Sequence, residues 1–198
     1  MNEQMSKGEI TRQRIIVEAA PVFNRQGFAG SSMHDIMKAT GLEKGGLYRH
    51  FSCKEELAIE SFRYALDQAV KLRTHDIEHI SGAIPKLKFI IDRFVKTPSS
   101  VPGGCPLMNT AIDTDDGNPA LRKLAHQGIE DWKNRLIAIV DEGKKRSEIR
   151  KSIEPRRIAN TIVAALEGAL MISRLEGNRQ ALEDATVSLN FMFDGIAK

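Results

Sequence analysis

The stretch that decides the fold is Ser31–Phe51, which reads SSMHDIMKATGLEKGGLYRHF. Its spacing predicts two short helices joined by a tight turn. Ser31 and Ser32 are residues that cap a helix N-terminus, and Ile36 would lie on the inner face of the first helix. Gly41 would end that helix, because glycine adopts the positive φ that helix C-termini require.

The second helix of this stretch, Lys44–His50, is too short and too polar to be a core element. Leu47 is the side chain that it would bury. The remaining cationic, phenolic and imidazole groups suit phosphates and base edges in a DNA major groove. They belong to Lys44, Tyr48, Arg49 and His50. The pattern therefore indicates a helix-turn-helix that binds DNA.

Residues on both sides of this stretch extend the pattern. Before it come Thr11, Ile15, Ala19, Phe23, Gly27 and Phe28, and within and after it come Gly41, Lys44, Gly45, Leu47, Tyr48, His50, Phe51, Lys54 and Leu57. With these residues at these offsets, the first third of the chain resembles the N-terminal domain of TetR/AcrR-family transcriptional regulators.

The resemblance implies which residues contact DNA. It places groove-facing positions at Lys44, Gly45, Gly46 and Tyr48, phosphate contacts at His50 and Lys54, and His34 at the start of the supporting helix. We add Arg49 from its charge and position. Two residues depart from the family pattern, since Glu43 stands where a serine or threonine is frequent and Gly46 replaces a small or hydroxyl-bearing residue. Glu43 favours the helix dipole but repels phosphate.

Composition fits a soluble globular protein of one or two domains: 198 residues, 41% hydrophobic and 28% charged. The net charge of +3 permits DNA binding without demanding it, so affinity would come from charge placement and from dimerisation. The two cysteines, the lack of a secretory signal and the lack of a long apolar run predict a cytoplasmic protein that does not enter membranes.

Helical periodicity predicts an all-α fold of about nine helices. We expect a flexible arm at 1–9, the helix-turn-helix domain at 10–56 and a helical effector-binding and dimerisation domain at 57–198. The expected helices outside the helix-turn-helix are Ile10–Gln26, bent at Pro21, then 54–79, 85–95, a short helix opening at Cys105-Pro106, 118–143, 155–175 and 179–193.

The last two helices carry small and apolar residues at four-residue spacing, which suits a four-helix interface between two copies of the chain. The expected interface residues are Ala164, Ala165, Gly168, Ala169, Val187 and Phe191. The alternative is that they pack within one monomer. The resemblance implies the homodimer, whose two recognition helices would bind a near-palindromic double-stranded DNA operator about one DNA turn (~34 Å) apart, or a multiple of it.

The second domain shows no nucleotide-binding loop and no nucleophile elbow, so we expect no cofactor and no enzyme activity. The resemblance implies a cavity for a small, largely apolar effector that releases the protein from DNA. The expected lining is Phe89, Phe94, Cys105, Leu107, Met108, Asn109, Ile112, Trp132, Leu136, Met171 and Leu175. The alternative is that these residues belong to the core, because apolar side chains at helical spacing are core more often than cavity lining.

Cys105 precedes Pro106 at an expected helix N-terminus, where the dipole lowers a thiol's pKa. This position suggests release by thiol modification as an alternative to an apolar effector. A second reading of Cys105 is a small apolar residue of the cavity.

Two further patterns point to metal ions. The residues from His75 to His79 match H-x-x-E-H, in which two histidines on one helix face bind zinc and Glu78 polarises water. The alternative function is therefore a helical metal-dependent hydrolase that uses His75 and His79. The other interpretation of these residues is a solvated helix end. The residues 113–118, DTDDGN, resemble a calcium loop, but the glycine comes one place early, so a polar turn is the better interpretation.

Overall fold

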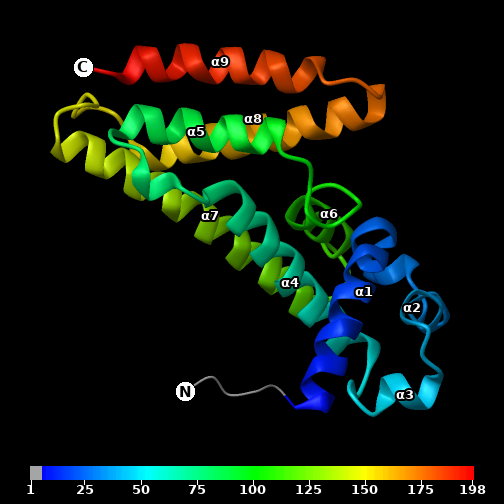
Figure 1. Cartoon of the computed structure of the whole chain (residues 1–198). Helices are drawn as coiled ribbons and strands as arrows, with labels where there is room; N and C mark the ends of the chain where they lie inside the picture. Colours follow the sequence, from blue (N-terminus) through cyan, green and yellow to red (C-terminus); the bar gives the residue numbers. More distant parts are fainter. Residues whose placement is uncertain (1–5) are drawn as a thin grey trace. The chain divides into compact units, whose positions relative to one another are not determined.

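The computed structural model describes residues 6–198, which form nine α-helices, one 3₁₀ turn and no sheet (Figure 1). The predicted all-α fold and helix number are confirmed. The helices are α1 (Lys7–Gly30), α2 (Met33–Thr40), α3 (Lys44–Tyr48), α4 (Lys54–Thr74), α5 (Ala83–Lys96), α6 (Pro106–Asp113), α7 (Pro119–Lys145), α8 (Pro155–Glu176) and α9 (Gln180–Ile196), and the 3₁₀ turn η1 is Ile77–His79.

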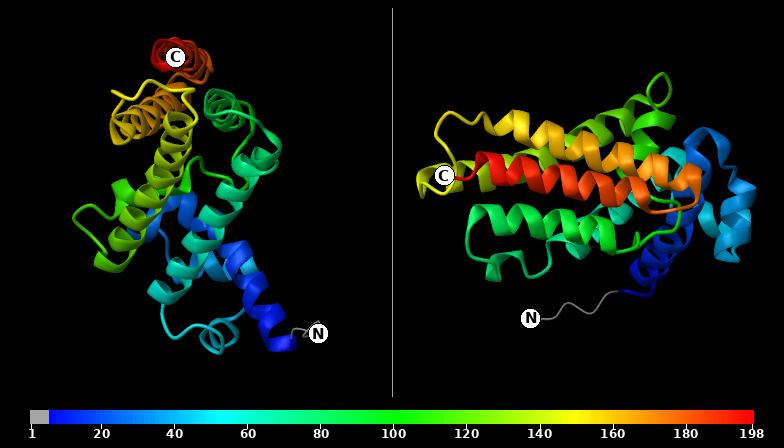
Figure 2. Two further views of the ribbon diagram at one scale, coloured as in Figure 1. Left: turned by 90° about the vertical axis from the view of Figure 1, so that its left-hand side faces the viewer. Right: turned by 90° about the horizontal axis from the view of Figure 1, so that it is seen from above.

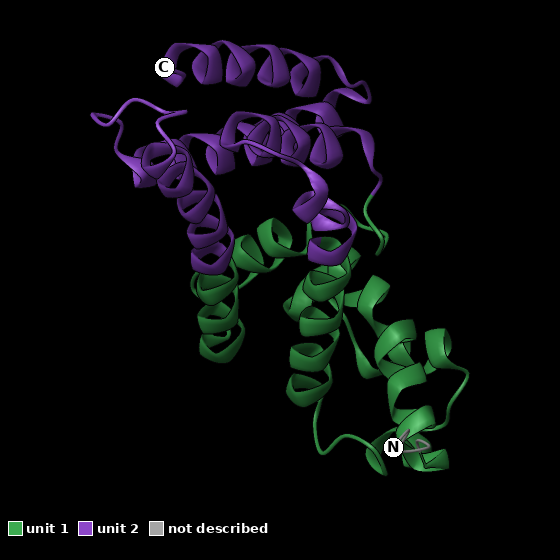
Figure 3. Ribbon diagram, turned by 60° about the vertical axis from the view of Figure 1, so that its left-hand side comes forward, with its two compact units in different colours: residues 1–69, 99–128 green, residues 70–98, 129–198 purple. Residues whose placement is uncertain are grey.

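The chain divides into two compact units (Figure 3). Unit 1 comprises residues up to 69 together with 99–128, and unit 2 comprises 70–98 and 129–198. Helices α4 and α7 each begin in unit 1 and end in unit 2. The predicted boundary between residues 56 and 57 divides the chain once. The two units differ from this division, because the segment 99–128 belongs to unit 1.

Helix α1 starts at Lys7, three residues before the predicted Ile10, because Ser6 and Glu9 cap its N-terminus reciprocally. The Ser6 hydroxyl accepts from Glu9 N at 3.3 Å, and the Glu9 carboxylate accepts from Ser6 N at 2.7 Å. Of the predicted flexible arm, residues 1–5 lie outside the described residues, whereas 7–9 are helical. The non-helical residue inside α1 is Gly27, with φ of 74°, rather than the expected bend at Pro21.

The predicted helix-turn-helix is present as α2 and α3. Ser32 caps α2 through a reciprocal pair of bonds with Asp35, and Gly41 ends it with φ of 65°. The fully buried Ile36 of α2 and Leu47 of α3 belong to one core cluster with residues of α1 and α4. Burial of these two side chains therefore anchors α2 and α3 in the core of unit 1.

Helix α6 packs against α1 within unit 1 through polar contacts. Asn109 Nδ2 donates to the carbonyl oxygen of Asn24 at 2.9 Å, and the Asp113 carboxylate accepts from Phe28 N at 2.6 Å. Gly27 permits this approach, since a Cβ there would lie 2.7 Å from Asp113 Cγ. The segment that resembles a calcium loop thus begins with a carboxylate that caps the last turn of α1.

Unit 2 has its core between α5, α8, α9 and the part of α7 after residue 128. Figure 2 shows α5, α8 and α9 running alongside one another. Leu136, Ile162, Leu166 and Phe193 are among its fully buried side chains. The chain end is tied to this unit, because Arg150 N donates to the carbonyl oxygen of Ile196 at 3.1 Å.

Helix α8 is the one helix among residues 6–198 whose length and apolar content would allow it to cross a membrane. Its apolar residues have another explanation, because Ile158, Ile162 and Leu166 are buried in the core of unit 2. Core helices of soluble proteins have the same composition.

Helix α4 ends at Thr74, five residues before the predicted end at His79. Asp76 has a positive φ of 69°, which reverses the chain and begins the 3₁₀ turn η1. The predicted 54–79 helix is therefore wrong in its last turn, where the residues between the two histidines do not continue the α-helix.

Candidate DNA-binding surface

Helix α3 separates one buried side chain from an exposed face. Leu47 is fully buried, whereas Lys44, Gly45 and Arg49 are exposed and Tyr48 is 43% exposed. Lys44 Nζ lies 5.9 Å from the centre of the Tyr48 ring, within cation–π range. The four residues predicted to face DNA from this helix and its C-terminal end are accessible to a partner.

The two glycines of α3 differ in their surroundings. A Cβ added to Gly45 would meet no atom within 4 Å, while a Cβ on Gly46 would lie 3.7 Å from the Leu42 side chain, an ordinary contact. Neither glycine is therefore required by the packing of unit 1. A need for close approach by a partner is a physical reason for a glycine at an open position such as Gly45.

The other predicted DNA contacts are less uniform. His34 is exposed near the start of α2, and His50 is half-buried after α3. Lys54 Nζ donates to the carbonyl oxygen of Phe28 and lies 4.4 Å from the centre of its ring. Lys54 thus has an intramolecular role that the sequence did not suggest, although an ammonium group has three donors.

Glu43 is the N-cap residue of α3, and its side chain makes no capping hydrogen bond. The carboxylate is exposed at the end of the helix that carries Lys44. It places a negative charge next to Lys44 in the sequence. Electrostatic attraction to phosphate is weakened locally by this residue.

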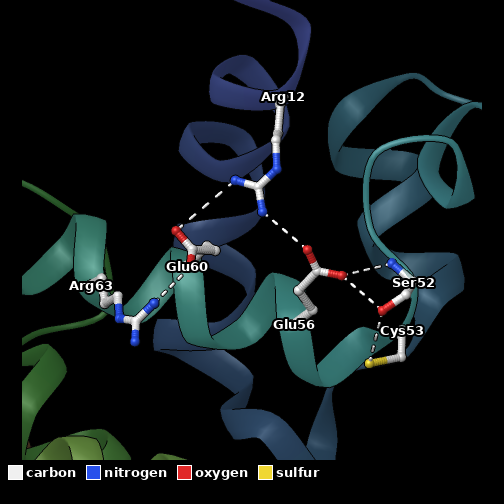
Figure 4. Close-up of polar contacts among 6 residues, drawn as sticks. All are labelled: Arg12, Ser52, Cys53, Glu56, Glu60 and Arg63. Carbon is white, nitrogen blue, oxygen red and sulfur yellow. Dashed lines mark hydrogen bonds and ion pairs between the residues drawn. The ribbon is translucent and has the colours of Figure 1, made fainter. Parts of the chain in front are cut away.

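A polar network holds the chain directly after α3 (Figure 4). The Glu56 carboxylate accepts from both Ser52 N and Ser52 Oγ, each at 2.8 Å, and pairs with Arg12 of α1 at 3.1 Å. The hydrogen bonds from Ser52, followed by the contact with Arg12, lower the pKa of Glu56 below its ordinary value. The Ser52 hydroxyl also lies 3.8 Å from the sulfur of the exposed Cys53.

The residues predicted to line the effector cavity fall in both units. Cys105, Leu107, Met108, Asn109 and Ile112 belong to unit 1, and Phe89, Phe94, Trp132, Leu136, Met171 and Leu175 belong to unit 2. In unit 2 the Phe94 and Trp132 rings stack with centres 5.7 Å apart, and the Arg73 guanidinium covers Phe94 at 4.2 Å.

Burial distinguishes these residues further. Cys105, Leu107 and Leu136 are at most 2% exposed, whereas Ile112 is 68%, Met171 45% and Leu175 81% exposed. The last three lie on surfaces of their own units, which differs from the enclosed lining expected of a cavity. Apolar spacing along a helix does not distinguish a cavity from an uncovered face.

The predicted dimer residues divide in a similar way. Val187 and Phe191 of α9 are 54% and 73% exposed, and Ala164 of α8 is exposed. Ala165 and Gly168 are half-buried. Ala169 is 6% exposed and belongs to the core of unit 2, so its place is inside the monomer rather than on a surface.

The histidine pair does not form the zinc site that the alternative hydrolase function would need. His75 Nδ1 lies 2.6 Å from Asp76, and His79 lies in η1, so the two rings do not share an α-helical face. Among the described residues, the one group with metal-ligand spacing is the exposed set Asp76, Glu78 and His79, without His75. The hydrolase geometry requires both histidines, and the end of α4 at Thr74 removes it.

Arg12, Ser52 and Glu56 are functional candidates that sequence reasoning did not identify as a network. The only local signal is the four-residue spacing from Ser52 to Glu56, which is compatible with side-chain contact at a helix start. Arg12 has no such signal, because its partner Glu56 lies 44 positions away in the chain.

Comparison with known proteins agrees with the geometry. Family models match residues 15–60 as bacterial regulatory proteins of the tetR family and residues 83–189 as a tetracyclin repressor-like C-terminal domain. The structures of TetR-family regulators from Cytophaga hutchinsonii and Chloroflexus aurantiacus are 36% and 38% identical, each with a TM-score of 0.92 and 98% of both chains covered. The HTH-type transcriptional repressor DhaR of Mycobacterium sp. (strain GP1) is 24% identical, over 87% of this chain and 86% of that relative.

Proposed function

Because the chain belongs to the TetR family of DNA-binding transcriptional regulators, we propose that it is a repressor that binds a near-palindromic operator as a homodimer. A small, largely apolar effector would release it from DNA. The protein would act without catalysing a reaction, in the cytoplasm where its DNA lies.

The observation that carries the DNA-binding proposal is the division of α3 between Leu47 and the exposed face of Lys44, Gly45, Tyr48 and Arg49. A helix anchored by one leucine presents a lysine that can reach guanine O6 and N7 or a phosphate. Tyr48 can donate to a phosphate or contact a thymine methyl. His34, Gly46, His50 and Lys54 would complete the contact surface.

The proposal of a dimer rests on apolar side chains of α8 and α9 that unit 2 leaves uncovered. Val187 and Phe191 lie four residues apart on α9, and Ile172 and Leu175 of α8 are 41% and 81% exposed. Monomeric soluble proteins seldom expose several large apolar side chains together. Pairing two copies would cover them and would supply the two recognition helices that a palindrome requires.

The effector would act by shifting a population of dimers toward a form whose recognition helices are wrongly spaced for the operator. Helix α4 runs from the helix-turn-helix region of unit 1 into unit 2 and could transmit this change. Helix α6 is also connected to the helix-turn-helix region, because Asn109 and Asp113 form hydrogen bonds with α1. A full reversal of occupancy requires a difference of about 5.5 kcal/mol in effector affinity between the two forms.

Apolar effectors are favoured over thiol modification by the burial of Cys105. Its side chain is 2% exposed at the N-terminus of α6, so an oxidant or electrophile would reach it only after unit 1 opened locally. Within unit 2, the apolar effector would contact Phe89, Phe94 and Trp132.

The DNA-binding proposal is tested by fluorescence anisotropy with a labelled fragment from upstream of the coding gene and a scrambled fragment of equal length. We expect saturable binding that prefers the upstream fragment and weakens steeply with salt, because several phosphates release counterions. Equal binding to both fragments, or binding that does not respond to salt, would contradict the proposal.

A further inference from the structure

Arg12 of α1 contacts the part of the chain that follows α3 (Figure 4). Its guanidinium pairs with Glu56 at 3.1 Å and lies 4.0 Å from Glu60, both on α4. The same group lies 4.5 Å from the centre of the Phe51 ring. One side chain of α1 therefore contacts both the Phe51 ring, which lies between α3 and α4, and two glutamates of α4.

The Glu56 carboxylate continues this connection to the backbone. It accepts from Ser52 N and Ser52 Oγ, so the peptide next to Phe51 is held by the carboxylate that Arg12 pairs with. Phe51 itself is 3% exposed and donates its N–H to the carbonyl oxygen of Leu47 at 3.0 Å. Arg12, Glu56 and Ser52 thus form a continuous chain of contacts from α1 to the segment that follows α3.

Helix α3 depends on such contacts for its orientation. It has five residues, fewer than an isolated helix needs for stability, and one fully buried side chain, Leu47. A single buried residue leaves rotation about its own position poorly restrained. The positions of Lys44 and Tyr48 must therefore be set by the segments that precede and follow the helix.

We propose that Arg12 is a positioning residue for DNA recognition: through Glu56 and Ser52 it fixes the orientation of α3, and with it the register of Lys44, Tyr48 and Arg49 on base edges. This inference rests on the proposed DNA-binding function. Phosphate contacts tolerate small displacements, whereas hydrogen bonds to base edges do not. Loss of Arg12 therefore lowers sequence discrimination while leaving nonspecific binding nearly unchanged.

The test compares Arg12→Gln with Arg14→Gln, a matched control on the same helix. Arg14 pairs with Glu18 of its own helix at 3.8 Å, whereas Arg12 pairs with Glu56 and Glu60 of α4. Both changes remove one positive charge. Arg12→Lys keeps the charge without the planar fork, and Glu56→Gln removes the partner. Circular dichroism first establishes a temperature at which every variant is folded.

The first measurement is hydrogen exchange of the peptides covering residues 44–53 in the full-length protein without DNA. We expect several-fold faster exchange of this segment in Arg12→Gln, a smaller increase in Arg12→Lys and no change in Arg14→Gln. Exchange equal to wild type in Arg12→Gln, or equally raised by Arg14→Gln, overturns the proposal whether or not the protein binds DNA.

The second measurement is the ratio of affinities for the upstream and scrambled fragments, with its salt dependence. Arg12→Gln should reduce this ratio roughly fivefold to tenfold with an unchanged salt slope, since it removes no phosphate contact. The double variant with Glu56→Gln should be no worse than the more affected single variant, because both act through one pair. If wild type discriminates between the fragments and Arg12→Gln has the same affinity ratio, the proposal is overturned. If wild type does not discriminate, the proposed DNA-binding function is contradicted instead. Hydrogen exchange then decides the role of Arg12.

Discussion

Each unit exposes a surface that suits a partner, and the two surfaces have opposite chemistry. In unit 1 the exposed face of α3 carries Lys44, Tyr48 and Arg49, whereas in unit 2 the exposed faces of α8 and α9 carry Leu175 and Phe191. Charged and hydrogen-bonding groups suit a partner that is itself charged, and apolar groups suit a surface that excludes water. If the proposed function is correct, DNA contact and the proposed self-association would be separable, and they would respond differently to salt and to mutation.

The largest effect should come from removing the reading groups of α3. Lys44→Ala combined with Tyr48→Ala should weaken operator binding roughly a thousandfold, at about 2 kcal/mol for each residue. The dimer mass should remain that of wild type. Anisotropy titration and light scattering on the same samples check both statements. A double variant that binds as wild type would remove α3 from the DNA-binding surface.

The second effect concerns the apolar surface of unit 2. Phe191→Glu should raise the dimer dissociation constant roughly a hundredfold, because a symmetric interface receives each substitution twice. Light scattering across a dilution series measures the change. Ile112→Glu is the control, since Ile112 is a comparably exposed apolar residue of unit 1, at 68% against 73% for Phe191. A loss of dimer in both variants, or in neither, would refute the assignment of the interface to α9.

Gly45 distinguishes folding from recognition at a single position. Gly45→Ala should raise the free energy of unfolding by about 0.5–1 kcal/mol, as expected for a helical glycine with open surroundings, and should weaken operator binding roughly tenfold by blocking close approach. Gly195→Ala, also helical with no atom within 4 Å of the added Cβ, should stabilise without affecting DNA binding. Thermal melts and anisotropy give the two readouts, and unchanged DNA affinity in Gly45→Ala would show that no partner approaches there.

The smallest effect is the pH dependence contributed by Glu56. Its pKa is lowered in the folded protein, so the carboxylate stabilises the fold above its ordinary pKa of 4.5, and this contribution is lost as the pH falls below that value. The side chain is 37% exposed, so screening limits the contribution to about 0.5 kcal/mol. Urea unfolding of wild type and Glu56→Gln at pH 6 and pH 3.5 should show a smaller acid loss in the variant. Equal acid losses would mean that Ser52 and Arg12 do not favour the ionised form.

Local sequence signals predicted most of unit 1. Ser32 and Gly41 mark the ends of α2 because capping and positive φ are requirements of a few residues, and the structure confirms both. Leu47 was identified as the anchor of α3 because it is the apolar residue of an otherwise polar pattern. The accessibility of Lys44 and Tyr48 followed from the same pattern.

Features that depend on distant residues could not be predicted. The cap that Asp113 gives to Phe28 joins positions 85 apart, and the contact between Arg12 and Glu56 joins positions 44 apart. The early end of α4 depends on the positive φ of Asp76, a residue type for which helix and turn are both reasonable. Burial also depends on distant residues. The spacing of Ala169 and Leu175 therefore predicted apolar helix faces but did not show which of the two residues is buried.

The most direct test of the central claim is dimethyl sulfate protection of guanine N7 in the operator, because this atom lies in the major groove where α3 would bind. We expect two protected regions related by the operator's two-fold symmetry, with centres about 34 Å apart or a multiple of that distance, and loss of both in Lys44→Ala with Tyr48→Ala. A single protected region, or protection that survives the double substitution, would contradict DNA recognition by a paired α3.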